Sequence, residues 1–393
     1  MVVNVRSVAR KRLLDMNPRK KILIICGGTS PEHEVSIITG LQVFENIDTA
    51  HYEPLVIYLT KKGEYRLLPK LKSKKDFLST SRKSIVFGTD IRGGYIKIPG
   101  PLTKKQYPYA VFLALHGGTG ESGAIQGLLE SLHIAFTSVG VEAAAITLNK
   151  KLTKDVLATH DIRTVTGLSL YSSELTKTEL AIKRVIDTLG LPVIIKPVHL
   201  GSSIGIEVAT TAIELEKKLL TASQLDSEIL VEKYLPEFIE YNCAVRLING
   251  KLEASEIEQP ISHDQILSFA DKYERGGKKT NSNGMASLSR ELPAKISPEL
   301  KLQIQETAKR AFSACRCRGM VRIDFMKTPD GTLYLTEINS IPGSMAFYLW
   351  EASGIPFKQQ ITDLIEEAVT AAQTASSMGL DYQSDIVEKF TRS

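Results

Sequence analysis

The chain has 393 residues, too many for one ordinary hydrophobic core, so two or three domains are expected. Its hydrophobic content of 43% and charged content of 24% are those of a globular protein in water, and no apolar run approaches the ~20 residues that cross a bilayer. The net charge of +5 comes from scattered basic residues, which excludes nucleic acid and a membrane as expected partners but suits phosphate-bearing ligands.

The amino-terminal end and the cysteines give little functional information. Residues 1–20 form a basic extension without the apolar core of a secretory signal. We expect this extension to be disordered, and an Arg-rich transit peptide is the alternative. The cysteines match no common zinc or redox spacing, so the reducing cytoplasm is the expected location. They are Cys26, Cys243, Cys315 and Cys317.

A strand, a glycine turn and a helix form the first predicted unit. Lys21–Cys26 is a continuous apolar run, typical of a parallel strand covered on both faces. The sequence GGTSPEHEVS follows at residues 27–36 and leads into an apolar-periodic helix that ends near Phe44. This order predicts a doubly wound unit with a ligand at the carboxyl end of the strand. The spacing is not G-x-G-x-x-G, so dinucleotide binding is weakly supported. Glu32 stabilises the first helical turn whether or not it binds a ligand.

A second strand-turn-helix unit follows an irregular basic stretch. His51–Tyr58 predicts a strand, whereas the broken hydrophobic pattern of residues 61–105 predicts an irregular, solvated excursion with short strands. Tyr109–Leu115 is the next buried strand, and it ends at HGGTGESG before a helix over residues 124–132.

His116 opens that glycine-rich turn and should point into the same crevice as Glu32. A purely structural hydrogen-bonding role is the alternative for this histidine.

The organisation changes after Val141. Residues 143–158 are helical in character and contain Asn149-Lys150 and then Lys154. An apolar strand then ends in Lys196, whose buried ammonium is costly unless it meets an anion.

The sequence GSSIGI follows at residues 201–206. Its glycines let the backbone approach a phosphate, and Ser202 and Ser203 can donate hydrogen bonds to it. This is not the Walker pattern, so a P-loop fold is disfavoured. A plain glycine hairpin is the alternative.

A strand and a long polar loop come next. Residues 228–235 predict a strand that enters a linker, and Glu240 precedes another strand at Tyr241–Leu247. Residues 259–292 are polar and too long for a tight connection, which is typical of a lid or a binding loop. A helix from Pro298 to Arg316 follows.

The most informative stretch is a predicted hairpin at residues 320–339. Arg322 and Asp324 alternate with apolar residues and therefore face one side. A turn at Pro329-Asp330-Gly331 leads to a second strand, on which Glu337 and Asn339 share a face. Oxygen ligands of this kind suit Mg²⁺. The alternative is an exposed hairpin with a charged outer face, but residues 340–344 leave the strand pattern and could bring backbone N–H groups beside the cation.

These motifs together resemble the D-alanine:D-alanine ligases of the ATP-grasp superfamily. The resemblance is strongest at Arg322-Ile323-Asp324, Glu337-Ile338-Asn339 and Pro342-Gly343, and it covers most of the chain. It implies an α/β fold, with an N-terminal doubly wound parallel-sheet domain and a two-part ATP-grasp domain that is α+β in its C-terminal half. The domains expected are a basic extension at 1–20, the N-terminal domain at 21–140, a central subdomain at 141–237, a C-terminal subdomain at 238–373 with a lid at 259–292, and a loose tail at 374–393.

The resemblance also implies roles for individual residues. The catalytic residues implied are Glu32, Ser202, Arg322 and Gly343. The substrate-binding residues implied are His116, Glu121, Lys272, Tyr273 and Ser344. The ATP-binding residues implied are Lys150, Lys196, Ser202, Ser203, Glu232, Lys233, Leu235 and Glu240. The implied ligands of Mg²⁺ (or Mn²⁺) are Asp324, Glu337 and Asn339.

The reaction implied is the ATP-dependent joining of two D-alanine molecules through a D-alanyl phosphate, by an enzyme expected to be a homodimer. Asn149 stands where relatives have Asp, and Ala270-Asp271 where they have Glu-Ala. After Gly343 relatives read M-T-S-x-S, whereas this chain reads SMAFYLW, which leaves D-lactate or D-serine open as the acceptor. A nucleotide-binding protein without ligase activity and a nicotinamide-dependent enzyme are the other hypotheses.

Overall fold

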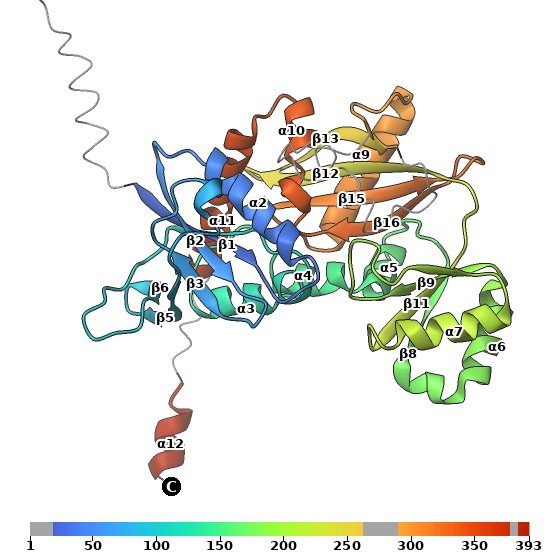
Figure 1. Cartoon of the computed structure of the whole chain (residues 1–393), viewed down its shortest axis with the longest axis horizontal. Coiled ribbons are helices and arrows are strands. Elements are labelled where there is room, and N and C mark those ends of the chain that lie inside the picture. Colours follow the sequence, from blue (N-terminus) through green and yellow to red (C-terminus); the bar gives the residue numbers. More distant parts are fainter. Residues whose placement is uncertain (1–18, 262–289, 378–383, 393) are drawn as a thin grey trace, which may run out of the picture.

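The computed structural model describes residues 19–261, 290–377 and 384–392. They form three β-sheets and a small two-stranded hairpin, with helices packed against the sheets (Figure 1). Within these ranges no helix is both long and apolar enough to cross a membrane.

The N-terminal sheet is mixed. Its strand order is β4 (Lys83–Ser84), β3 (Tyr65–Leu68), β2 (Tyr52–Leu59), β1 (Lys20–Gly27) and β7 (Ala110–Leu113). The predicted α/β class is confirmed, because β1 pairs in parallel with both β2 and β7. The stretch 61–105 contains short strands, as predicted: β3 and β4 add an antiparallel edge, and β5 (Val86–Asp90) and β6 (Gly93–Lys97) form the separate hairpin. The flanking helices are α2 (His33–Asn46) and α3 (Ala124–Ser131).

The predicted helix at 143–158 is two helices. They are α4 (Val141–Leu148) and α5 (Lys150–Ala158), separated at Asn149, whose backbone is extended. The Oδ1 atom of Asn149 accepts a hydrogen bond of 2.8 Å from the N–H of Leu152 and so caps α5. The break places Lys150 at the first position of the new helix.

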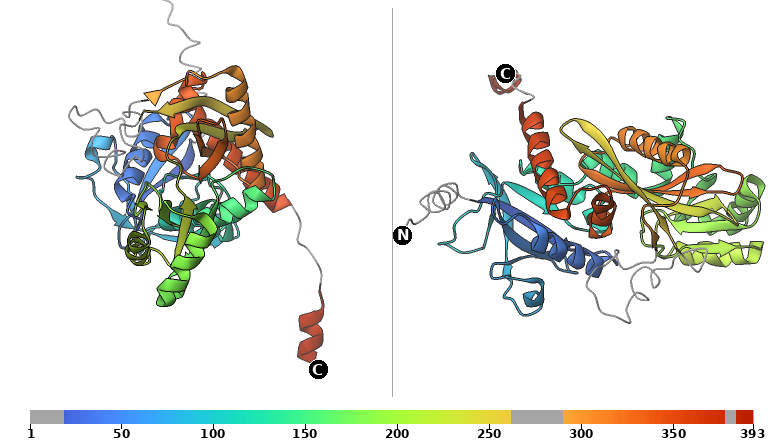
Figure 2. Two further views of the ribbon diagram at one scale, coloured as in Figure 1. Left: turned by 90° about the vertical axis from the view of Figure 1, so that its right-hand side faces the viewer. Right: turned by 90° about the horizontal axis from the view of Figure 1, so that it is seen from above.

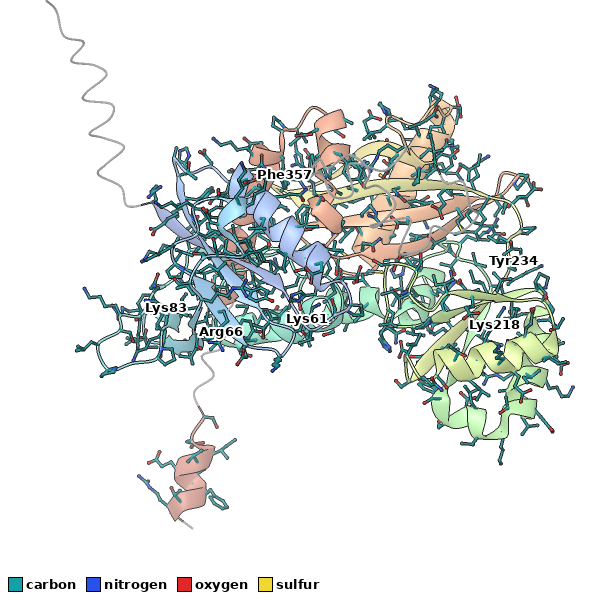
Figure 3. All side chains as sticks on the ribbon, viewed as in Figure 1. Lys61, Arg66, Lys83, Lys218, Tyr234 and Phe357 are labelled. Carbon is teal, nitrogen blue, oxygen red and sulfur yellow. The ribbon has the colours of Figure 1, made fainter. Side chains whose placement is uncertain are left out.

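The second sheet is antiparallel and has a core of its own. Its order is β10 (Glu207–Ala209), β9 (Val193–Pro197), β11 (Glu228–Lys233) and β8 (Gly167–Tyr171). Helices α6 (Thr178–Leu189) and α7 (Ala212–Ala222) pack on this sheet and on each other. This lobe lies at the opposite end of the molecule from the N-terminal sheet, with Lys218 on α7 and Tyr234 where the chain leaves the lobe (Figure 3).

The third sheet contains the predicted hairpin. Its order is β14 (Arg290–Glu291), β13 (Lys251–Pro260), β12 (Ile239–Ile248), β15 (Met320–Lys327) and β16 (Leu333–Asn339), and α9 (Pro298–Ala314) packs on it. The turn between β15 and β16 is confirmed by a hydrogen bond from the Gly331 N–H to the Thr328 carbonyl. Two details differ from prediction: Glu240 lies inside β12, and the ends of the predicted lid belong to β13 and β14. Lys272 and Tyr273 lie outside the described residues.

The carboxyl-terminal helices join the third sheet to the N-terminal sheet. Helix α10 (Phe347–Ala352) and α11 (Phe357–Ser377) contribute to the core that β1, β2 and β7 also build, and Figure 2 shows α11 beside these strands. Glu366 on α11 accepts hydrogen bonds from Tyr52 at 2.7 Å and from Tyr109 at 2.6 Å. Helix α11 continues to Ser377 and α12 (Ile386–Arg392) follows it, so both reach into the tail at 374–393 that was predicted to be loose. The domain boundaries remain predictions.

Candidate active site

A cleft opens where the three sheets approach one another. It is lined by residues of the turns after β1 and β7, of the second sheet with its GSSIGI loop, and of β12, β15 and β16. Every predicted site residue in the described part of the chain lines this cleft except Ser344, which is buried directly behind it. The motifs therefore meet in space although they are spread over some three hundred residues of sequence.

Glu32 links the N-terminal part to the loop that follows β9 in the second sheet. It is buried at the start of α2, and its carboxylate accepts a hydrogen bond from the hydroxyl of Ser202. Two glycines surround it: a Cβ on Gly117 would lie 2.7 Å from Oε2 of Glu32, and a Cβ on Gly201 would lie 3.1 Å from the same atom. Gly117 also has a φ of +66°, so this turn requires glycine. The carboxylate is thus enclosed by backbone and suited to a small cationic group.

His116 is held by protein groups on both ring nitrogens. Its Nδ1 lies 2.7 Å from the carbonyl oxygen of Ile341, which makes Nδ1 the donor, and its Nε2 accepts from the hydroxyl of Thr39 at 2.8 Å. The same hydroxyl accepts from the N–H of Ser344 at 3.1 Å. Burial lowers the pKa of His116 to about 4, so the ring is neutral. These contacts favour the structural alternative for His116, and its role toward substrate remains a prediction.

Glu121 ties the turn after β7 to the segment after β16. Its carboxylate accepts from the N–H of Gly117 at 2.7 Å and from both the hydroxyl of Ser340 and the N–H of Ile341 at 3.0 Å. Burial, with the nearby charge of Glu32, raises the pKa of Glu121 to about 7 despite these donors. A buried carboxyl group, Glu32, and a half-buried one, Glu121, therefore line the same end of the cleft.

The raised pKa of Glu121 predicts a pH dependence of stability. Because the folded-state pKa of about 7 exceeds the ordinary 4.5, the stabilisation is fully present below pH 4.5 and is lost as the pH rises toward and through 7. Urea unfolding of the wild type should lose about 3 kcal/mol across this window relative to Glu121→Gln. Parallel pH profiles of the two proteins would contradict the assignment.

Two basic side chains, from α5 and β9, also line the cleft. Lys150 Nζ donates to the carbonyl of Leu200 at 2.6 Å and lies 3.6 Å from Oε1 of Glu337. Lys196 Nζ lies 2.5 Å from Oε2 of Glu232, whose side chain is 4% exposed. Burial raises the pKa of Glu232, but the charges of Lys196 and Lys154 outweigh it and lower that pKa to about 2. Both lysines line the same cleft as the GSSIGI loop, an arrangement that suits phosphate binding.

The predicted metal ligands share one wall of the cleft. Asp324 and Glu337 are direct partners in the β15–β16 ladder, and the amide of Asn339 donates to Asp324 at 3.1 Å. The guanidinium of Arg322 donates a hydrogen bond of 2.7 Å to each carboxylate oxygen of Asp324, a contact that was not predicted. Burial lowers the pKa of Arg322, yet the charge of Asp324 outweighs this and the pKa is raised well above its ordinary value.

The donors on this wall fit a hard divalent cation. Across the described ranges no three His, Cys, Asp or Glu side chains cluster as a metal site. Two carboxylates and an amide suit a cation that takes its remaining oxygen ligands from phosphate and water. Asp324 would have to share its oxygens between the cation and Arg322.

Sequence reasoning missed several residues of the cleft. Asn242 and Glu258 both line it, and the amide of Asn242 donates to Glu258 at 3.1 Å. Asn242 could have been found, because it shares a strand face with Glu240. Glu258 lies on β13, for which no strand was predicted.

Comparisons with known proteins identify the family of the chain. The family models described as D-ala D-ala ligase N-terminus and C-terminus match residues 21–139 and 156–366. The D-alanine--D-alanine ligase of Thermosipho africanus is 33% identical over 90% of this chain and 94% of that protein. The structure of the D-alanine-D-alanine ligase from Coxiella burnetii has a TM-score of 0.75 and 28% identity over 92% of this chain and 97% of its own. The VanG D-Ala:D-Ser ligase from Enterococcus faecalis has a TM-score of 0.75 and 27% identity over 89% and 99%. The chain belongs to the D-ala D-ala ligase family, as its motifs predicted.

Proposed function

We propose that this protein joins two D-alanine molecules at the expense of ATP and so supplies D-alanyl-D-alanine for peptidoglycan precursors. The observation that carries the proposal is the meeting, in one cleft, of an enclosed carboxylate, two lysines beside a glycine-serine loop, and a wall of oxygen ligands. The names of the relatives support the choice of substrate.

In the first step the carboxylate of one D-alanine attacks the γ-phosphorus of ATP. A P–O bond to the carboxylate forms, the bond to the bridging oxygen breaks, and ADP leaves. Glu32 holds the ammonium of this D-alanine, while Lys150 and Lys196 neutralise charge on the phosphates. A divalent cation bound by Asp324, Glu337 and Asn339, proposed to be Mg²⁺, would supply further charge neutralisation. Such catalysis depends on positioning more than on any single base.

In the second step the neutral amine of the second D-alanine attacks the carbonyl carbon of the acyl phosphate. The new C–N bond puts negative charge on the carbonyl oxygen. When the carbonyl reforms, the C–O bond to the phosphate breaks, inorganic phosphate leaves with the bonding electron pair, and the amine gives up one proton to the departing phosphate or to water. In this proposal Arg322 and the N–H of Gly343, two residues of the cleft lining, stabilise that oxygen.

A second candidate function keeps the chemistry and changes the acceptor. The segment after Gly343 differs from the sequence of relatives, and Ser344, Met345 and Ala346 all adopt left-handed backbone conformations, with φ of 53°, 54° and 45°. One structural neighbour is a D-Ala:D-Ser ligase. D-Serine or D-lactate would then replace the second D-alanine.

Product analysis distinguishes the two candidates. The purified protein is incubated with Mg²⁺, ATP and D-alanine, with and without D-serine or D-lactate, and ADP release and product mass are measured. The proposal predicts ADP formation with D-alanine alone and a product with the mass of D-alanyl-D-alanine. ADP formation only when another acceptor is added would favour the second candidate, and ATP binding without ADP release would refute both.

Two further properties of the enzyme, its location and its oligomeric state, belong to the proposal. The four cysteines are all free and buried, which fits the reducing cytoplasm. A homodimer is proposed from the resemblance to the family, and light scattering on the purified protein tests it.

A further inference from the structure

Lys154 is a buried cation to which the proposed mechanism gives no role. It lies on α5, its side chain is only 11% exposed, and its ammonium pairs with Oε1 of Glu232. The same ammonium donates to the carbonyl of Val165 at 2.6 Å. Lys196, from β9, pairs with the other carboxylate oxygen, Oε2. Glu232 is therefore held between two ammonium groups from two different elements.

The three groups carry one more positive charge than negative charge. Glu232 stays ionised at neutral pH because its two partners lower its pKa to about 2 against the effect of burial. Burial lowers the pKa of Lys154, and the positive charges of Lys196 and Lys151 lower it further. The contact with Glu232 raises this pKa but does not restore it to its ordinary value. An excess cation with so little access to water is costly unless an anion joins it. The cluster of Lys154, Lys196 and Glu232 therefore favours the binding of an anion.

Only one of the two lysines can move to that anion. Lys196 lines the cleft, whereas Lys154 does not and is fixed behind it by the Val165 carbonyl. The side chain of Glu232 has little room to move with Lys196, because β8 packs closely against it. A Cβ atom on Gly167 of β8 would lie only 2.9 Å from Cγ of Glu232. When Lys196 turns to a phosphate, Glu232 stays in place.

We propose that Lys154 is a positioning residue for nucleotide binding. Its ammonium stays paired with Glu232 when the ammonium of Lys196 turns to the phosphates of ATP. This inference rests on the proposed ATP site. Without Lys154, the departure of Lys196 would leave a buried carboxylate with no counter-ion, which is strongly unfavourable. The ammonium of Lys196 would then stay paired with Glu232, and the phosphates of ATP would lose their contact with Lys196.

The test is the change Lys154→Met, which keeps the length of the side chain and removes its charge. Isothermal titration of Mg²⁺-ATP, without amino acids, should show a Kd raised at least about tenfold, equivalent to ~1.4 kcal/mol. The kcat at saturating ATP should change by less than about threefold, because a positioning residue for binding mainly affects KM. Lys154→Arg should retain most of the affinity.

Lys151→Met is the matched control. Lys151 lies on the same helix but pairs with Asp155 at 2.6 Å and is further from Glu232 than Lys154 is. Its removal should leave the Kd within about twofold of wild type, because an exposed ion pair of this kind contributes little.

The change Lys154→Met, made in a Glu232→Gln protein, distinguishes the positioning role of Lys154 from a contribution to packing alone. In a Glu232→Gln protein, Lys196 has no carboxylate to leave, so Lys154→Met should cause no further loss of affinity. An equal loss in both backgrounds, or wild-type affinity in Lys154→Met, would overturn the inference. Failure of the wild type itself to bind Mg²⁺-ATP would instead overturn the proposed ATP site, and this inference with it.

Discussion

Replacing Arg322 with alanine is expected to lower kcat by about 10²- to 10³-fold while raising KM for ATP far less. The guanidinium is buried in the cleft and locked in a two-point contact with Asp324, so its position is fixed before substrate arrives. Loss of one preorganised donor to a developing oxyanion costs about 3 to 4 kcal/mol in the transition state. Steady-state kinetics with ATP and D-alanine varied separately measures the effect.

The control for this change is Arg316→Ala. Arg316 is exposed and pairs with Glu142 at 2.9 Å, so its loss should leave kcat unchanged and cost at most about 1 kcal/mol of stability. Thermal unfolding of both variants shows whether Arg322→Ala remains folded. A folded Arg322→Ala protein with normal kcat and a raised KM for ATP would contradict the proposed role of Arg322.

The change Glu32→Gln is expected to raise the KM for the first D-alanine by about 10- to 100-fold. It removes the negative charge that would pair with the substrate ammonium but preserves the shape of the side chain and an acceptor for the hydroxyl of Ser202. A hydrogen bond to a charged group contributes about 1.5 to 3 kcal/mol, which corresponds to this range. Initial rates over a wide range of D-alanine concentration separate the two amino-acid subsites.

Glu34→Gln provides the comparison. Glu34 lies one helical position beyond His33 in the first turn of α2, its side chain is 73% exposed, and it pairs only loosely with Lys61 at 3.3 Å. Both glutamates interact with the same helix N-terminus, so any effect on the helix is shared. If the two variants show the same D-alanine kinetics, Glu32 does not hold the ammonium.

Local periodicity predicted the elements that carry the site. The apolar runs at β1 and β7 fixed two neighbouring parallel strands, and the turns at their carboxyl ends had to meet. The alternation in β15 and β16 placed Arg322, Asp324 and Asn339 on one face, where the structure shows them in contact. In each case a few neighbouring residues are enough to predict the strand. An unbroken apolar run indicates a strand buried on both faces, and a period of two shows which side chains share a face.

What the sequence could not reveal depends on partners distant in the chain. The broken pattern of residues 61–105 predicts short strands but neither their bounds nor their partners, because β3 and β4 depend on pairing outward from β2. The break between α4 and α5 is made by a side-chain cap at Asn149, without a glycine or proline to mark it. The contact of Lys154 with Glu232 joins two elements that no local pattern connects.

The fate of the carboxylate oxygen of D-alanine tests the account most directly. The protein is incubated with Mg²⁺, ATP and D-alanine labelled with oxygen-18 in its carboxylate, and the inorganic phosphate released is analysed by mass spectrometry. Attack of that carboxylate on the γ-phosphorus predicts one labelled oxygen in each phosphate. Release of unlabelled phosphate would contradict the acyl phosphate route and the positioning of both substrates in this cleft.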